Sequence, residues 1–156
     1  MMKNYNYPLV ILIMFLTVFS VQSQSNSQKP LEVINFKKNV EAPLTANEIQ
    51  MLKEVYSHNL QAEILSRPQR LMFIKDILRN RVEYFQLNGK DLSKIKPLSQ
   101  IKLFNTFNND LVRDRVFNKE TFNPLKYLFR FYGRQGELVH VDYTNWIIKI
   151  KPQHHN

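Results

Sequence analysis

Hydrophobic residues change their spacing once along this chain. Between residues 44 and 87 they recur every three or four positions, as they do on one face of a helix. Between residues 125 and 151 they fall into short runs rich in β-branched and aromatic residues, which is typical of strands. Helices followed by strands indicate an α+β domain. We therefore predict two amphipathic helices packed on a C-terminal three-stranded antiparallel meander.

The first helix has the clearest start signal. Thr45 can cap the helix while Glu48, three residues on, reaches back to the Thr45 amide, which is the capping-box arrangement. The helix is therefore predicted to begin at Ala46, and either to end near residue 58 or to continue to residue 64. Its buried face is predicted to carry Ile49, Leu52, and Val55 or Tyr56.

A second, longer helix is predicted from residue 67 to residue 87. Ser66 is the candidate cap, Pro68 stands in the first turn where its missing N–H costs nothing, and Gln69 completes a capping-box pattern. The Asn88-Gly89 pair offers a left-handed exit. The apolar face consists of Leu71, Ile74, Leu78, Val82 and Phe85.

Three strands are predicted in the last third, at residues 125–132, 138–143 and 146–151. A Gly-Arg-Gln-Gly turn separates the first two, and a tight link separates the last two, so consecutive strands should pair antiparallel. The preceding residues, 90–121, show no sustained period. Within them, 98–104 could form a strand and 108–116 a helical turn.

The N-terminal 23 residues have the layout of a secretory signal peptide. Lys3 precedes an apolar run from Leu9 to Phe19, and small and polar residues follow it. We predict cleavage after Ser23, which makes Gln24 the new N-terminus. The alternative is an uncleaved anchor, but the run is about 14 residues long where a membrane span needs about 20. No cysteine is present to carry a lipoprotein lipid. The chain is thus predicted to be exported, to the periplasm or the medium of a bacterial source.

The predicted organisation has four parts. The signal peptide occupies residues 1–23, a flexible Ser/Gln-rich lead-in residues 24–43, a single α+β domain residues 44–152, and a disordered tail residues 153–156. Cleavage leaves 133 of the 156 residues, which is enough to bury a conventional core without disulfides.

The sequence contains no assembled catalytic motif. The absence of cysteine excludes thiol nucleophiles and Cys-ligated metals, and three glycines could hardly build a phosphate-binding loop. The weak catalytic candidates are His140 and Asp142, which lie two apart on a predicted strand and so point to one face. A solvent-facing polar pair is the favoured interpretation. No cofactor and no metal site are predicted.

Other titratable residues have ordinary interpretations. His58 is expected at a helix end, and the His154-His155 pair supplies only two of the four ligands that zinc needs. Asp110 and Asp114 would meet on one face if that stretch were helical. Arg113 and Arg115 lie among them, so an ion-paired surface explains them better than acid–base catalysis.

Positive charge suggests the class of partner. The chain carries 22 Lys and Arg against 13 Asp and Glu, and removal of the leader leaves a net charge of +8. Outside the cytoplasm, a basic protein favours anionic envelope components such as lipid phosphates and acidic polysaccharides. Nucleic acid is a poorer candidate by location. The aromatic and basic run 127–134 also lacks the glycines of the RRM strand signature.

Three hypotheses follow. The leading one is a small exported protein that binds an anionic envelope component or another envelope protein, without catalysis. The second is a hydrolase with a dispersed site that uses His140, Asp142 and an acid from residues 90–121. The third is a subunit of an envelope complex, which should expose a large apolar patch.

Overall fold

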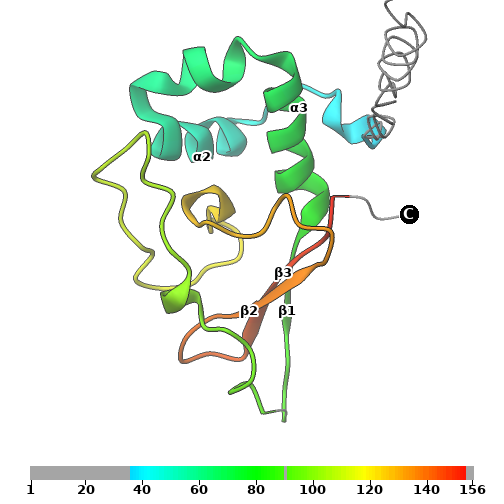
Figure 1. The fold of residues 1–156 in the computed structure, drawn as a ribbon, viewed down its shortest axis with the longest axis vertical. Helices are drawn as coiled ribbons and strands as arrows, with labels where there is room; N and C mark the ends of the chain where they lie inside the picture. The colour runs from blue at the N-terminus through cyan, green and yellow to red at the C-terminus, as the bar shows by residue number, and fades with distance from the viewer. Residues whose placement is uncertain (1–35, 90, 154–156) are drawn as a thin grey trace, which may run out of the picture. The chain divides into compact units, whose positions relative to one another are not determined.

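The structure is a computed structural model that describes residues 36–89 and 91–153 (Figure 1). The predicted signal peptide with its cleavage site, residues 24–35 of the lead-in and His154-His155 lie outside the described residues. The described chain contains two α-helices and a three-stranded antiparallel sheet, so the predicted α+β class is confirmed. The elements are α2 (Ala46–Tyr56), α3 (Pro68–Asp76), β1 (Val82–Gln86), β2 (Glu137–His140) and β3 (Trp146–Ile150).

Helix α2 begins as predicted. The Thr45 hydroxyl accepts a hydrogen bond from the Glu48 amide at 3.2 Å, and the Glu48 carboxylate accepts one from the Thr45 amide at 2.8 Å. Leu52, Val55 and Tyr56 are buried. The prediction for Ile49 is wrong, because its side chain is 36% exposed.

Helix α2 does not run on unbroken to residue 64. The backbone of Ser57 adopts a φ of 48°, and a 3₁₀ turn and one π-helical turn carry the chain to Leu65. The predicted Ser66 cap is also wrong, because α3 starts after Arg67 without a side-chain cap. The Ser66 hydroxyl instead accepts a hydrogen bond from the Gln61 amide group.

The predicted second helix is wrong in its last part. After α3, one π-helical turn at Ile77–Arg81 leads directly into β1. Val82 and Phe85 fit a helical face, but Val82–Gln86 is also rich in β-branched and aromatic residues. Every β1 residue pairs with β3, and this pairing makes the segment a strand rather than a helix, because tertiary contacts override local propensity.

The sheet has the order β1-β3-β2, with both pairs antiparallel. The β2–β3 hairpin was predicted, but residues 125–132 do not form the third strand. Their burial does alternate, since Leu125, Tyr127, Phe129 and Phe131 are buried. The amides of Phe129 and Phe131 donate to the carbonyls two residues earlier, so tight local turns replace ladder bonds. The side chains thus follow the predicted pattern while the backbone does not.

The segment between β1 and β2 has little regular structure. Leu98–Gln100 is a 3₁₀ turn rather than part of a strand, and residues 108–116 are not helical. Leu103 and Tyr127 form a single antiparallel bridge. The buried residues of this segment join those of both helices and the sheet in one core, which includes Leu52, Ile77, Ile101, Phe122, Tyr127, Val139 and Ile148. No helix within the described ranges is long and apolar enough to cross a bilayer.

Candidate functional site

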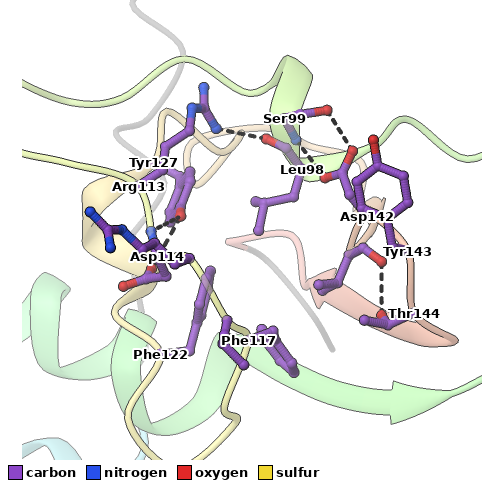
Figure 2. A pocket seen from close by; sticks show the side chains of 13 residues that line it. Leu98, Ser99, Arg113, Asp114, Phe117, Phe122, Tyr127, Asp142, Tyr143 and Thr144 are labelled. Carbon is purple, nitrogen blue, oxygen red and sulfur yellow. Dashed lines mark hydrogen bonds between the residues drawn. The ribbon is translucent and has the colours of Figure 1, made fainter.

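A pocket of about 460 Å³ opens on the irregular side of the domain (Figure 2). Its lining comes from four parts of the chain: residues 98–99, the loop 113–117, residues 122 and 127, and the hairpin turn 141–144. No two of these parts are adjacent in sequence. The pocket therefore exists only when the whole domain is folded.

Apolar side chains form the floor of the pocket. Leu98, Phe122 and Val141 are each less than a tenth exposed. Phe117 packs on Phe122 with ring centroids 5.2 Å apart. Apolar surface continues onto the rim, where Val116 is 81% exposed. The interior can therefore accept an apolar group.

A buried lysine supports the loop that carries one wall. The Lys126 ammonium group lies 2.8 Å from Asp114 Oδ1 and 3.0 Å from Glu54 Oε1, and the side chain is 3% exposed. Burial opposes its charge, but hydrogen bonds to the two carboxylates outweigh burial and raise the Lys126 pKa. The Tyr127 hydroxyl donates to Asp114 Oδ2 at 3.1 Å. Burial raises the pKa of Tyr127 to about 12, so it remains a neutral donor.

Arg113 lies beside this cluster and has no carboxylate partner among the residues that the structure describes. Its guanidinium donates to the Leu98 carbonyl at 3.0 Å and to the Ile101 carbonyl, and lies 5.7 Å from the centre of the Tyr127 ring. These partners are neutral, so its positive charge is not cancelled. Arg115, also in the lining, is exposed.

The hairpin turn forms the opposite wall. Asp142 accepts hydrogen bonds from the Ser99 amide at 2.8 Å and the Ser99 hydroxyl at 2.6 Å, which ties this wall to residues 98–99. Tyr143 is fully exposed and has a φ of 58°, a conformation that costs energy for a residue other than glycine. The His140 ring donates from Nε2 to the Thr144 carbonyl at 2.6 Å. These bonds hold the strained turn at the rim.

The two predicted site residues are thus placed differently. Asp142 lines the pocket, whereas His140 does not, and each bonds a different partner. The Ser99 hydroxyl donates straight to Asp142, with no imidazole between them to remove its proton. Burial tends to raise the pKa of Asp142, but the bonds from Ser99 outweigh it and lower the pKa, so this carboxylate is a poor base near neutral pH.

The remaining predicted candidates do not assemble a site. Asp110 and Asp114 do not share a helix face, because residues 108–116 are not helical. His58 is exposed, and its ring lies 3.1 Å from the Asn59 amide group. In the described part of the chain, no three His, Asp or Glu side chains gather closely enough to hold a metal ion.

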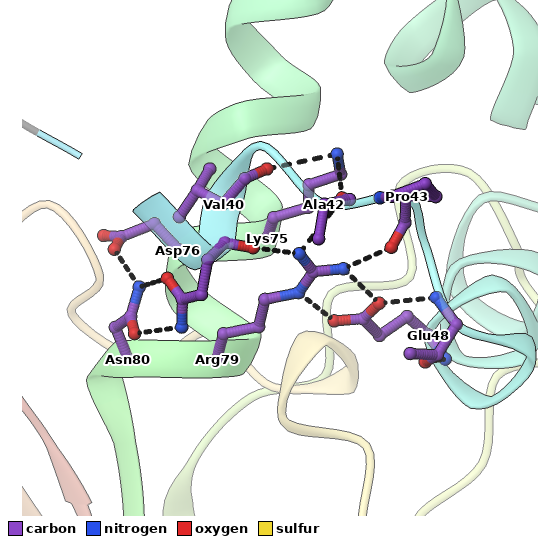
Figure 3. A network of polar contacts seen from close by, with 10 residues as sticks. Val40, Ala42, Pro43, Glu48, Lys75, Asp76, Arg79 and Asn80 are labelled. Carbon is purple, nitrogen blue, oxygen red and sulfur yellow. Dashed lines mark hydrogen bonds and ion pairs between the residues drawn. The ribbon is translucent and has the colours of Figure 1, made fainter. Parts of the chain in front are cut away.

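A second polar cluster, shown in Figure 3, lies away from this pocket and ties residues 39–43 to α3 and to the turn after it. Lys75 donates to the carbonyls of Val40 at 3.2 Å and Ala42 at 2.8 Å. Arg79 donates to the Pro43 carbonyl at 2.8 Å and to both oxygens of Glu48, at 2.6 and 2.7 Å. The described end of the predicted lead-in is therefore fixed to the helices.

Substitution of Glu48 tests this second cluster. The hydrogen bond from Arg79 is the main cause that lowers the Glu48 pKa below its ordinary value of 4.5. The contribution of this hydrogen bond to stability is therefore present above pH 4.5. It is lost as the pH falls through the lower pKa that Glu48 has in the folded chain. We expect Glu48→Gln to reduce the free energy of unfolding by about 1 to 2 kcal/mol at pH 7 and by much less at pH 2.5. Urea unfolding at both pH values measures this, and an equal loss at both would contradict it.

Substitution of Lys126 tests the support of the pocket wall. Removal of one partner from a fully buried ion pair lowers the free energy of unfolding by about 3–5 kcal/mol. Asp114 and Glu54 are partly exposed, so we expect Lys126→Met to lower it by about 2 to 3 kcal/mol. Lys119→Met is the matched control, because the Lys119 side chain is 52% exposed. Urea unfolding at pH 7 compares the variants. Equal stability of the two would show that the cluster does not hold the loop.

The sequence offered no signal for Lys126, Ser99 or Arg113 as parts of this site. Lys126 interrupts an alternating apolar run, where a solvent-facing lysine is the ordinary expectation.

The chain was also compared with known proteins. No protein-family model, curated protein or solved structure matches it.

Proposed function

We propose that this chain is a small exported protein that works without catalysis, by binding an anionic envelope component with an apolar portion in the pocket described above. The observation that carries the proposal is the combination in one pocket of an apolar floor with two guanidinium groups that form no ion pair within the described ranges. Apolar pockets with a few placed polar groups are the usual form of ligand sites.

Binding is favoured over hydrolysis by the pairing of the acids in the lining. Asp114 is committed to Lys126 and Tyr127, and Asp142 is committed to Ser99. Neither is poised to accept a proton from a substrate. A dispersed hydrolase site would also need His140 in the pocket, and its ring bonds the hairpin backbone instead.

The two arginines of the lining favour an anion. Arg113 and Arg115 line the pocket beside Asp114 and Asp142, and Asp114 is paired with Lys126, which it shares with Glu54. The net charge of +8 after cleavage would add attraction at long range. The ligand thus combines a negative group at the guanidiniums with an apolar portion on Phe117 and Phe122.

A second candidate, a subunit of an envelope complex, is favoured by the rim. Val116 is 81% exposed and Tyr143 is fully exposed, and both line the pocket opening. An apolar side chain of a partner protein would cover them. Such a partner would be retained at high salt, whereas an anionic component would be released.

The dye 8-anilinonaphthalene-1-sulfonate is a suitable probe, because it joins aromatic rings to a sulfonate and fluoresces in apolar sites. We expect the folded chain to bind it, and Arg115→Gln to weaken binding about fivefold, the equivalent of about 1 kcal/mol. Val116→Asp should weaken it further, because it adds negative charge and removes apolar surface. Fluorescence titration at low and high salt gives the affinities.

Arg134→Gln is the control for loss of positive charge, because Arg134 is exposed and does not line the pocket. Circular dichroism must show that each variant is folded, since the dye also binds partly folded chains. If all variants bind with equal affinity, the pocket is not the site. Weakening by Val116→Asp alone, with no effect of salt, would favour the apolar partner over the anion.

Export has its own test. Intact mass spectrometry of the protein from its native host should find a chain that begins at Gln24. Replacement of Ser23 by a bulky residue such as Trp should impair this cleavage, because the peptidase accepts small residues at that position. A mature protein that retains Met1 or Met2 would contradict the proposed export.

A further inference from the structure

We propose that two copies of this chain pair antiparallel through the outer edges of β1 and form one six-stranded sheet across a two-fold axis. This inference rests on the backbone of the sheet and is independent of the pocket. It concerns an edge that the β1-β3-β2 order leaves at one side of the sheet (Figure 1).

The hydrogen bonds at the two ends of β1 show which backbone groups point outward. The Lys151 amide donates to the Arg81 carbonyl at 2.8 Å, and the Leu87 amide donates to the Asn145 carbonyl at 2.9 Å. In an antiparallel pair every second residue faces the partner strand, so the odd-numbered residues of β1 face β3. The N–H and C=O groups of Val82, Tyr84 and Gln86 therefore point away from the sheet. Apart from the π-helical turn at Ile77–Arg81, which Val82 closes, no residue in the described ranges hydrogen-bonds to them.

The opposite edge of the sheet is largely closed. The outward amide of His140 in β2 donates to the Lys96 carbonyl at 2.9 Å, and Pro97 forms a bridge with His140. This closure leaves Leu138 as the one outward position in β2 without a described partner. A ladder needs consecutive outward positions, and β1 alone offers three.

The open edge lacks three of the features that prevent pairing. Natural edge strands are protected by proline, by charged residues and above all lysine, or by a bulge, among other features. Val82–Gln86 contains no proline and no lysine, and its register with β3 is continuous. Its one charged residue, Glu83, is paired within the sheet to Lys149 and Lys151. The side chains of Val82, Tyr84 and Phe85 are only half-buried, so a further strand would cover apolar surface.

A second copy fits this edge because the strand is compatible with itself. Antiparallel pairing centred on Tyr84 places Tyr84 opposite its own copy and Val82 opposite Gln86 of that copy. Glu83 then faces Phe85 rather than another Glu83, so no like charges meet. This register forms about six backbone hydrogen bonds. A single open edge gives a closed two-fold dimer and stops further growth.

Gln86→Pro is the sharpest test. It removes an outward N–H and leaves the β1–β3 ladder intact, since Gln86 bonds outward and its side chain is exposed. Gln86→Ala is the control, because it changes the same side chain but keeps the N–H. Sedimentation velocity of the full chain at 5 to 200 µM should show a dimer for the wild type and Gln86→Ala and a monomer for Gln86→Pro. Circular dichroism checks that each variant is folded.

Hydrogen exchange of the wild type provides a measurement that needs no variant. Protection of the Val82, Tyr84 and Gln86 amides should rise at least tenfold between the lowest and highest concentrations, while Phe85, which bonds β3, stays constant. A wild type that is monomeric throughout, or a dimer that survives Gln86→Pro, overturns the proposal. Assemblies larger than a dimer overturn it too, because they would require a second open edge.

Discussion

The ammonium group of Lys126 joins parts of the chain that no ladder connects. It bonds Asp114 in the pocket loop and Glu54 in α2, and Asn123 donates to the same Glu54 carboxylate at 2.9 Å. The backbone of Lys126 also takes part, since its carbonyl accepts a hydrogen bond from the Phe104 amide. Burial of a charge is costly unless the charge is paired, and here two carboxylates pair with the ammonium group. Together with the hydrogen bonds that Asn108 and Asn123 donate to α2, this group ties the irregular half of the domain to the helix.

The features that sequence reasoning identified correctly arise between close neighbours. The capping box joins Thr45 to Glu48, three residues apart, and the β2–β3 hairpin turns over a few residues. Such contacts depend on the order of residue types within a few positions, so they can be predicted from one sequence. The α+β class followed from the succession of these local patterns.

The incorrect predictions concern segments whose structure depends on distant partners. Residues 82–86 satisfy both a helical and a strand pattern, and only β3 decides between them. Residues 125–131 bury alternate side chains, but short local turns satisfy the backbone. Of the candidate site, sequence reasoning found Asp142 but not its partner Ser99, because four separate segments meet only in the folded domain. The interpretation of His140 and Asp142 as a polar pair without a catalytic role stays a prediction, as do the signal peptide and export.

The pairing of β1 with the much later β3 also has a consequence for the order of folding. Arg81 and Lys151 bond each other across 70 residues, and the central strand of the sheet is the last of the three to be synthesised. Contacts between such distant residues form slowly, because a long loop must close first. During synthesis, the helices can form early, whereas the sheet cannot form before its middle strand, β3, has been made. Until then β1 and β2 have no neighbour in the sheet, because each of them pairs with β3 and not with the other.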